Sequence, residues 1–403
     1  MRILQLVPRF PFPEDDGGKI GIANIYKEFA KKGHEVTLFS LNHLRLDDSS
    51  VKYAEQFGKV IILNSDTKNN LKNIVKAFLA NKSIYINKHN HKSVYNFIDD
   101  LLSNLSKHEK YDIVHADHTC MSPLAIYIAK KLNIPVGQRL HNIEYKIWER
   151  YVDGLSRLNP KYYYLKYQAR LLQNEEQNIF NQIDVGFAIT KTDMKIARTI
   201  SPSANIILAS AGVDLDIFKI NPKLKKNKNQ LVIATTFNWV HNIEGLKWFI
   251  NQVLPLIKQE IPDISLRIIG KNPPSEFNNF NNLGVEVLGY VKSVIPYLQQ
   301  ANIYIAPLFV GSGIRIKILE ALAMGLPVIA TTVSAEGIEI DQNSGLFICN
   351  DPKEQAKNII GLLKNPENID KLGKQSLIAI KNNYSWKGNV EIMLKEYTKL
   401  LTV

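Results

Sequence analysis

The length, composition and charge of the chain set the first limits on its function. With 403 residues, 45% of them hydrophobic and 22% charged, the chain has the size of two or more globular domains, which excludes a disordered or fibrous protein. Its two cysteines exclude a disulfide framework, and no run approaches the roughly 20 apolar residues of a membrane-spanning helix, so we expect a cytoplasmic protein without a signal peptide.

The net charge of +12 leaves several kinds of partner open. No zinc-finger spacing and no basic motif interleaved with aromatic residues accompanies the charge, so nucleic acid is not an expected partner. An anionic membrane surface, with the protein peripheral at the inner membrane face, and anionic small substrates both fit. A bias toward lysine and asparagine across the whole sequence would also account for the charge.

The N-terminal segment has the pattern of a doubly wound parallel sheet. We expect a strand at 2–8, a helix at 19–32 and a second strand at 35–40. The loop between the first strand and the helix ends in Gly17 and Gly18, and ligands bind at this end of such strands. The loop lacks the Gly-x-Gly-x-x-Gly spacing of dinucleotide-binding proteins, so a dinucleotide cofactor is disfavoured. A plain turn without a ligand is the alternative.

Residues 66–110, which follow a strand at 60–63, are polar and rich in lysine and asparagine. Four apolar residues of this segment recur at helical spacing: Ile74, Val75, Phe78 and Leu79. Two interpretations stay open. The helix either lies on an anionic membrane surface or packs on the sheet of its own domain.

Polar residues follow the next two predicted strands, one at 111–117 and one that starts at Ile134. Ligand sites of doubly wound sheets lie at the carboxyl ends of their strands, so these side chains are expected to line a site. They are Asp117, His118, His141, Asn142 and Glu144. Asn142 also suits the N-cap of the helix that follows, and the two roles are compatible.

A domain boundary is expected between residues 210 and 230. A charged helix at 160–181 and strands at 184–189 and 205–209 complete the first domain, and the segment after Pro222 is charged and poor in apolar residues. An Asp-x-Asp string at 214–216 stands in this linker context without a nearby carboxylate cluster, so no metal site is expected there.

The second half of the chain repeats the alternation of strands and helices, which predicts a second doubly wound sheet. Its expected elements are a strand at 231–237, a loop at 238–245, a helix at 246–258, strands at 264–270 and 285–291, and a helix at 293–300.

The most informative stretch begins with an apolar strand at 301–309. Gly311 and Gly313 then allow a tight turn, and a helix is expected from Ile314 until Gly325 and the proline after it end the helix. A glycine loop that feeds a helix offers free N–H groups and the positive end of the helix dipole to an anion.

Two cations strengthen this anion-site hypothesis. Arg315 and Lys317 are expected in the first helical turn, where they oppose the dipole unless an anion is bound. Glu320 follows as an acceptor for a ribose or sugar hydroxyl. The alternative is a crossover helix with a surface arginine and lysine and no ligand.

Two stretches resemble a known family. The sequence Gly-Ser-Gly-Ile-Arg-Ile-Lys-Ile-Leu-Glu-Ala at 311–321 resembles the donor-site signature of retaining glycosyltransferases of family 4, and 140–150 is similar to the same subgroup. The resemblance implies the GT-B fold, in which two Rossmann-like domains face an interdomain cleft. These domains would be 1–210 and 211–384, with a helix at 385–403 packing back on the first.

The resemblance also implies an activity, which is transfer of a sugar from a nucleotide-sugar donor to a hydroxyl of a glycan, glycolipid or protein with retained anomeric configuration. The nucleotide-diphosphate-sugar is then a co-substrate, and neither a resident cofactor nor a metal is expected. The implied catalytic residues are Asp117, His118, Arg315 and Glu320. The implied acceptor-side residues are His141, Asn142 and Glu144. The implied donor-binding residues are Gly17, Gly18, Thr236, Asn238, His241, Asn242, Gly289, Val291, Gly311, Ser312, Gly313, Ile314, Arg315, Lys317 and Glu320.

The sequence departs from the wider family at several of these positions. Ser312 stands where the family has a glutamate, and Thr236 and His241 stand where most members have an arginine and a lysine. Asp117 replaces the second histidine of a His-x-His motif, which leaves His118 one residue late. Two other functions therefore stay open, an epimerase of the same fold that acts on a sugar nucleotide and a sugar-nucleotide binder without activity.

Overall fold

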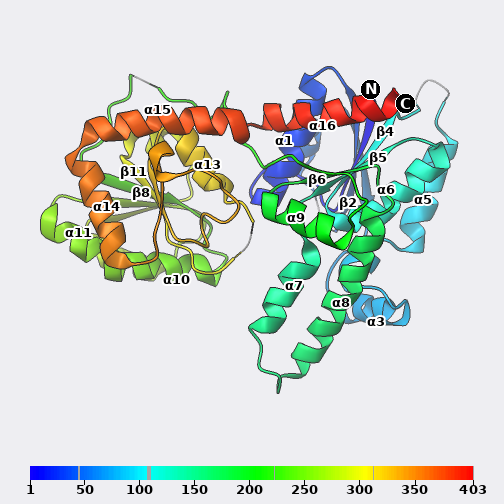
Figure 1. Ribbon diagram of the computed structural model, residues 1–403, viewed down its shortest axis with the longest axis horizontal. Coiled ribbons are helices and arrows are strands. Elements are labelled where there is room, and N and C mark those ends of the chain that lie inside the picture. The colour runs from blue at the N-terminus through cyan, green and yellow to red at the C-terminus, as the bar shows by residue number, and fades with distance from the viewer. Residues whose placement is uncertain (44–45, 107–109, 222, 312, 403) are drawn as a thin grey trace. The chain divides into compact units, whose positions relative to one another are not determined.

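Two parallel β-sheets organise the part of the chain that the computed structural model describes, which is residues 1–43, 46–106, 110–221, 223–311 and 313–402 (Figure 1). The chain divides into two units, each built around one of the sheets. Unit 1 comprises Met1–Ser210 and Asn389–Val403, and unit 2 comprises Ala211–Gly388. Within the described residues, no helix combines the length and the apolar character needed to cross a membrane.

The sheet of unit 1 has the strand order β3-β2-β1-β4-β5-β6-β7. Its central strands are buried on both faces, as parallel strands between helical layers must be, and they are accordingly rich in Leu, Ile and Val. The strands are β1 Arg2–Val7, β2 Glu35–Asn42, β3 Lys59–Asn64, β4 Ile113–Asp117, β5 Val136–Leu140, β6 Val185–Ala188 and β7 Ile206–Leu208.

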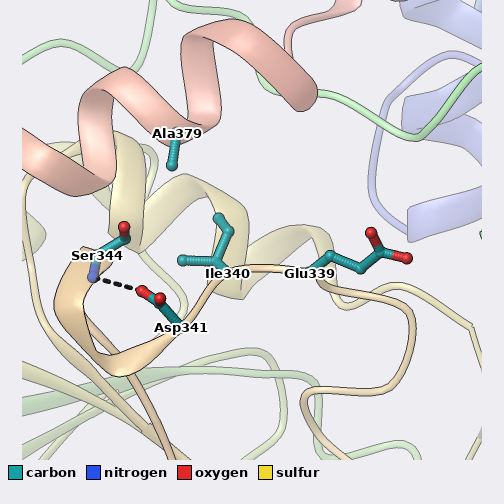
Figure 2. Close-up of a pocket in the computed structure, with 5 residues that line it drawn as sticks. All are labelled: Glu339, Ile340, Asp341, Ser344 and Ala379. Atoms are coloured by element: carbon teal, nitrogen blue, oxygen red, sulfur yellow. Dashed lines mark hydrogen bonds between the residues drawn. The ribbon is translucent and has the colours of Figure 1, made fainter.

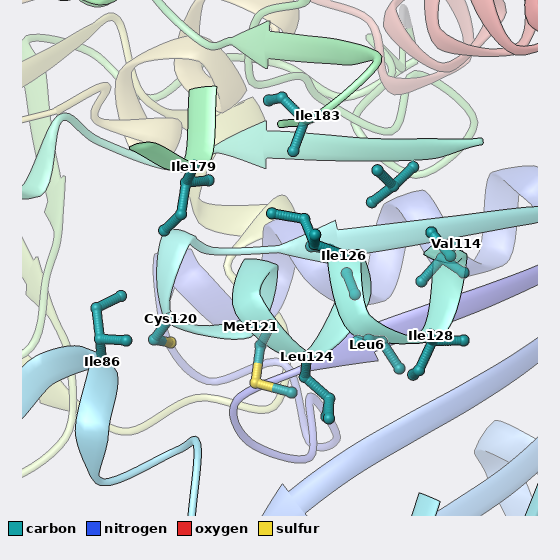
Figure 3. Packing of buried hydrophobic residues seen from close by; sticks show 14 of the residues in the cluster. Leu6, Ile86, Val114, Cys120, Met121, Leu124, Ile126, Ile128, Ile179 and Ile183 are labelled. Atoms are coloured by element: carbon teal, nitrogen blue, oxygen red, sulfur yellow. The ribbon is translucent and has the colours of Figure 1, made fainter. Parts of the chain in front are cut away.

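Helices connect these strands and bury their apolar faces on the sheet. Figure 3 shows one part of this core, where Met121, Leu124 and Ile128 pack with Leu6 and Val114 of the strands. The helices are α1 Gly17–Lys31, α2 Asp48–Glu55, α3 Leu71–Leu79, α4 Ile84–Asn87, α5 Lys92–Ser103, α6 Ser122–Leu132, α7 Glu144–Asp153, α8 Pro160–Phe180 and α9 Lys191–Ile200, with a 3₁₀ turn, η2, at Thr119–Met121.

The end of the chain completes the core of unit 1. Helix α16, Trp386–Leu401, places the buried hydroxyl of Tyr397 2.6 Å from Nδ1 of His115 on β4. A Cβ atom on Gly137 of β5 would lie 2.2 Å from this hydroxyl, so only glycine leaves room for the tyrosine. His115 is fully buried in this contact and has a structural role.

The sheet of unit 2 has the order β10-β9-β8-β11-β12-β13. The strands are β8 Gln230–Ala234, β9 Ser265–Ile269, β10 Val285–Gly289, β11 Ile303–Ala306, β12 Val328–Ala330 and β13 Leu346–Ile348. The helices are α10 Val240–Trp248, α11 Leu254–Glu260, α12 Ile295–Gln300, α13 Ile316–Ala323, α14 Pro352–Lys364 and α15 Pro366–Asn383, with 3₁₀ turns η4 Ser275–Leu283 and η5 Gln342–Ser344.

The helix predicted at 246–258 is interrupted. A π-helical turn, η3 at Phe249–Val253, separates α10 from α11. Pro255 lies in the first turn of α11 and has no N–H to donate, so the α-helical hydrogen-bond ladder cannot run through it.

Both sheets have the doubly wound order of Rossmann-like domains. In each, the first strand of the unit lies beside its fourth, and the strand order reverses between them. The predicted pair of Rossmann-like parallel-sheet domains is confirmed.

A close contact in unit 2 gives a test of this packing. A Cβ atom on Gly245 of α10 would lie 2.1 Å from the carbonyl oxygen of Pro307, directly after β11. We expect Gly245→Ala to lower the free energy of unfolding by about 2 kcal/mol, because α10 must move away from a backbone atom. Gly361 of α14 has open space around it, so Gly361→Ala should raise the free energy of unfolding by about 0.5 to 1 kcal/mol. Chemical denaturation measures both, and equal effects would contradict the packing.

Candidate functional site

Each sheet has a topological switch point, where the strand order reverses and ligands bind at the carboxyl ends of the strands. In unit 1 the switch point lies between β1 and β4, and in unit 2 it lies between β8 and β11. Most of the predicted site residues lie in the segments that follow these four strands.

The turn after β11 is built around Arg315. Gly311 has a φ of 140° and Gly313 a φ of 79°, both in the region that favours glycine. Nη1 of Arg315 donates to the carbonyl oxygen of Gly313 at 2.9 Å, and a Cβ atom on Gly311 would lie 2.2 Å from Nη2. The guanidinium therefore folds back over the turn. Ser312 lies outside the described residues.

Arg315 is the N-cap residue of α13, because the helix begins at Ile316. The prediction that the helix begins at Ile314 and holds Arg315 in its first turn is wrong, and Ile314 instead packs half-buried against the core. Partial burial lowers the pKa of Arg315, and Glu336 opposes the shift. A partly desolvated guanidinium interacts more strongly with an anion than an exposed one.

Lys317 and Glu320 form an ion pair on the first two turns of α13, with Nζ 2.9 Å from Oε2. Glu320 is buried, and burial raises the pKa of its carboxyl group while Lys317 opposes the rise. The start of α13 thus holds a buried carboxyl group paired with one cation, Lys317, and a second cation, Arg315, at its N-cap.

The segment after β8 differs from the prediction. Residues 238–245 were expected to form a loop, but α10 begins at Val240, so His241 and Asn242 lie in its first turn. The Asn242 amide donates to the carbonyl oxygen of Thr236 at 2.6 Å, which ties the helix to the turn. Asn238 is exposed in that turn, and the half-exposed His241 places Nδ1 3.3 Å from Glu244.

Gly289 is the last residue of β10 and Val291 follows the strand, which β9 separates from β8. Gly289 has a φ of 68°, and its carbonyl oxygen accepts from the N–H of Gly270 at 2.8 Å. A Cβ atom on Gly270 would lie 2.0 Å from the carbonyl oxygen of Thr235. The ends of β8, β9 and β10 therefore lie in contact along one edge of the sheet.

Unit 1 holds a buried ion pair at its switch point. Nη1 of Arg139 on β5 donates to Oδ1 of Asp117 on β4 at 3.1 Å, and both side chains are at most 1% exposed. Burial would raise the pKa of Asp117, but Arg139 and the neighbouring histidines outweigh it and leave the pKa below its ordinary value.

Two histidines stack beside this pair. The rings of His118 and His141 lie 4.5 Å apart at 17°, and each ring also lies near the ion pair. Nδ1 of His118 is 3.4 Å from Asp117 Oδ1, and Nδ1 of His141 is 3.3 Å from Arg139 Nη1. Burial lowers the pKa of His141, so this ring is neutral at pH 7.

His118 has a φ of 76° and ψ of 142°, which is rare for a residue with a side chain. Such strain persists only where the surrounding structure imposes it, and it is concentrated at functional sites. The backbone at the end of β4 is thus held in a costly conformation that places the His118 ring against His141.

Helix α7 begins at Glu144 with Ile143 as its N-cap, so the prediction of Asn142 as cap is wrong. The carboxyl group of Glu176 on α8 accepts from the N–H groups of Glu144 and Tyr145, both at 2.9 Å, and takes the place of a cap. Burial raises the pKa of Glu176 to about 8, against the effect of these two hydrogen bonds. Burial also raises the pKa of Glu144, while His118 opposes this rise.

Gly17 and Gly18 do not form a loop, since they are the first two residues of α1. Asp16 caps this helix by accepting from the N–H of Lys19 at 3.0 Å, and it also accepts from Nη2 of Arg9 at 2.6 Å. A Cβ atom on Gly18 would lie 2.7 Å from Nη2 of Arg9. The missing side chain therefore leaves room for an arginine at the start of α1.

Sequence reasoning missed three charged residues of this part of unit 1, namely Arg9, Arg139 and Glu176. An arginine inside a buried parallel strand, such as Arg139, is a usable signal, because it needs a buried partner. Glu176 gave no signal, since it is one of several charged residues on a long helix.

A pocket of about 390 Å³ lies elsewhere in unit 2, lined by Glu339, Ile340, Asp341, Ser344 and Ala379 (Figure 2). It adjoins η5 at the amino end of β13, whereas the switch point lies at the carboxyl ends of the strands. Its two carboxylates would repel a diphosphate. Within the described ranges, no group of three or more His, Cys, Asp or Glu side chains is placed to hold a metal ion.

Two family models match the chain. One, described as Glycosyltransferase Family 4, matches residues 16–217, and the other, described as Glycosyl transferases group 1, matches residues 228–365. An uncharacterized 44.6 kDa protein in the cps region of Klebsiella pneumoniae is 24% identical over 408 residues, which cover 96% of this chain and 97% of that protein. The uncharacterized glycosyltransferase MJ1069 of Methanocaldococcus jannaschii is 27% identical over 192 residues, 45% of this chain and 47% of the relative.

Solved structures share the fold over nearly the whole chain. Sucrose-phosphate synthase from Thermosynechococcus elongatus has a TM-score of 0.70 at 15% identity, covering 100% of this chain and 99% of that one. Anabaena Alr3699/HepE in complex with UDP has a TM-score of 0.68 at 11% identity, covering 99% and 100%. TarM has a TM-score of 0.65 at 12% identity, covering 98% of each chain.

Proposed function

Because this chain belongs to glycosyltransferase family 4, we propose that it transfers a sugar from a nucleoside-diphosphate donor to a hydroxyl group of an acceptor and retains the anomeric configuration. Sugar transfer follows from the family, and the GT-B type of fold accompanies it. The donor, the acceptor and the stereochemistry are our proposal. The observation that carries it is the group of Arg315, Lys317 and buried Glu320 at the start of α13.

The donor diphosphate would bind at the turn before α13. The planar guanidinium of Arg315 can grip phosphate oxygens with two parallel hydrogen bonds, and the N–H groups of the first helical turn face the same anion. Anabaena HepE has been crystallised with UDP and with UDP-glucose, which supports a donor of this class. Gly311, Ser312, Gly313 and Ile314 would supply backbone contacts.

Glu320 would accept hydrogen bonds from the two ribose hydroxyls. Lys317 opposes the rise that burial causes in the pKa of Glu320, and two of its three ammonium donors remain for a phosphate oxygen. The remaining residues of this unit would surround the nucleoside and the diphosphate: Thr236, Asn238, His241, Asn242, Gly289 and Val291.

In the reaction, the acceptor oxygen forms a bond to the anomeric carbon while the bond from that carbon to the diphosphate breaks. We propose that both events take place on one face of the sugar, which preserves its configuration. The hydroxyl proton passes to an oxygen of the departing diphosphate. Arg315, Lys317 and the N–H groups of α13 stabilise the charge that grows there, so the proposal needs no metal ion.

The polar cluster of unit 1 would act on the sugar and the acceptor. We propose that His118 contacts the transferred sugar. The ion pair of Asp117 and Arg139 would hold the imidazole ring of His118 in position. His141, Asn142 and Glu144 would line the acceptor side, and Gly17 and Gly18 would allow a ligand to approach the start of α1.

The experiment is a screen of nucleotide sugars by thermal shift, followed by a transfer assay with the stabilising donor in EDTA. We expect one donor to be slowly hydrolysed without an acceptor, to be transferred to a hydroxyl acceptor, and to give a product whose anomeric proton coupling matches that of the donor. Free nucleotide together with a rearranged sugar would identify an epimerase, and stabilisation without turnover would identify a binder. Either result, or an inverted product, contradicts the proposal.

A further inference from the structure

Helix α3 of unit 1 buries a polar residue and exposes its large apolar residues. Its polar residue Asn73 is 7% exposed and donates through its amide to the carbonyl oxygens of Asp66 and Lys68. Its large apolar residues face outward instead, with exposed fractions of 76% for Leu71, 64% for Phe78 and 79% for Leu79. A helix of a globular domain normally buries this stripe against the core.

Helix α8 extends the exposed surface. Figure 1 shows α3 beside α8, and the rings of Phe78 and Tyr167 lie 6.4 Å apart. The Tyr167 hydroxyl donates to Asn81 just after α3 at 2.8 Å, which fixes the two helices to each other. Tyr163, one turn before Tyr167, is 65% exposed. We call this surface the α3–α8 face.

The charge of the α3–α8 face is predominantly positive. Lys72 and Lys76 flank the apolar stripe of α3, and Lys166 and Arg170 flank the tyrosines of α8, all four exposed. The sequence contains no aspartate or glutamate from residue 67 to 98 or from 154 to 174. Asp66, just before α3, adds one exposed carboxylate near Lys72. An exposed apolar stripe with a surplus of cations at its border is complementary to a surface that is apolar inside and anionic at its rim.

We propose that the α3–α8 face binds the surface of an anionic phospholipid bilayer. Leu71, Phe78 and Leu79 enter the boundary between headgroups and acyl chains, and the lysines reach the phosphates. Tyrosine suits the same level of a bilayer because its ring is apolar and its hydroxyl polar. A protein partner fits less well, because the cores of protein interfaces are depleted in lysine. The inference does not depend on the proposed reaction, since vesicle binding needs no substrate.

The test is flotation of the full chain with vesicles of equal parts phosphatidylglycerol and phosphatidylcholine, against vesicles of phosphatidylcholine alone. We expect binding to the first only, and weaker binding at high salt. Lys72→Gln with Lys76→Gln should lower the partition coefficient roughly 30-fold, and Leu71→Ser with Leu79→Ser at least about tenfold. Lys353 and Lys357, an exposed pair with the same spacing on α14 of unit 2, provide the control, and their change to glutamine should leave binding unaltered.

Three outcomes would overturn the proposal. The first is that the wild-type protein binds neither kind of vesicle or binds both equally. The second is that the Lys72 and Lys76 variant loses no more binding than the Lys353 and Lys357 control. The third is that light scattering shows a dimer that the Leu71 and Leu79 variant dissociates, which would assign the face to a second copy of this chain. Because all these side chains are exposed, the thermal unfolding midpoint should be the same in every variant.

Discussion

Arg315→Ala is expected to lower the rate of sugar transfer about 10²- to 10³-fold. Arg315 is the N-cap residue of α13 and folds over the Gly311–Gly313 turn, where we propose that the leaving diphosphate gains negative charge as its bond to the sugar breaks. A cation fixed at that point stabilises the transition state more than the bound donor, because the charge grows during the reaction. The loss should therefore be larger in kcat than in the apparent affinity for the donor.

The control for this variant is Arg267→Ala. Arg267 is the other arginine of unit 2, and it lies on β9 paired with Glu286 at 2.6 Å. We expect its removal to leave kcat within about a factor of two, since a surface ion pair contributes little to stability. Steady-state kinetics with the identified donor measures both variants. Wild-type turnover in Arg315→Ala, or equal losses in the two variants, would show that the diphosphate does not bind at this turn.

Arg139→Met is expected to lower the free energy of unfolding at pH 7 by about 3 to 5 kcal/mol, because it leaves the carboxylate of Asp117 buried without its guanidinium. Arg139 and Asp117 are at most 1% exposed, so water cannot replace the lost partner. Methionine is unbranched and replaces the apolar stem of the arginine, but it ends short of the guanidinium, which lies 2.9 Å from the Cβ position of Gly21.

The effect of Arg139→Met should depend on pH. In the wild type the pKa of Asp117 is lowered, so the ion pair stabilises the fold above the unfolded pKa of about 4 and loses this contribution as the pH falls. In the variant, burial without the arginine raises the pKa of Asp117, and the buried carboxylate destabilises the fold increasingly as the pH rises from about 4. At pH 4 the wild-type ion pair still contributes, because the lowered pKa of Asp117 lies below that pH, whereas the unpaired carboxyl group of the variant is neutral. The difference between the two proteins should therefore be larger at pH 7 than at pH 4, and it should decline further as the pH falls through the lowered pKa.

A double variant, Arg139→Met with Asp117→Asn, is the matched control. It removes the unpaired charge, and we expect it to recover at least half of the stability that Arg139→Met loses. Urea denaturation at both pH values gives the full comparison. If the two substitutions are simply additive, or if the loss is the same at pH 4 and pH 7, the buried ion pair does not stabilise this part of unit 1.

The alternation of strands and helices could be predicted because the central strands are short, continuous apolar runs. Leu231 to Ala234 and Ile303 to Ala306 are buried at every position, and the segments between such runs have helical spacing. The turn around Arg315 could also be predicted, since Gly311 and Gly313 both require left-handed backbone. Local patterns of this kind need no knowledge of distant contacts.

The features of the fold and site that could not be predicted depend on strand register and on competition between local sequence patterns. Asp117 and Arg139 are direct neighbours in the pairing of β4 with β5, which 22 residues of separation in the chain conceal. Gly17 and Gly18 suggested a loop, but the Asp16 cap begins a helix there because its carboxylate satisfies a free N–H group. Glu176 reaches the start of α7 from a different helix, and no spacing rule indicates such a contact.

The contact between Tyr397 and His115 bears on how the protein forms during translation. The ribosome makes the seven strands of unit 1 first, then the whole of unit 2, and only afterwards the residues that fill the space above Gly137. Since domains generally fold as they emerge, unit 1 must wait in an incomplete state while its neighbour is synthesised. The first half of the molecule is therefore the last to reach its native packing, and a nascent chain stalled before residue 389 would carry an uncovered apolar surface for chaperones to bind.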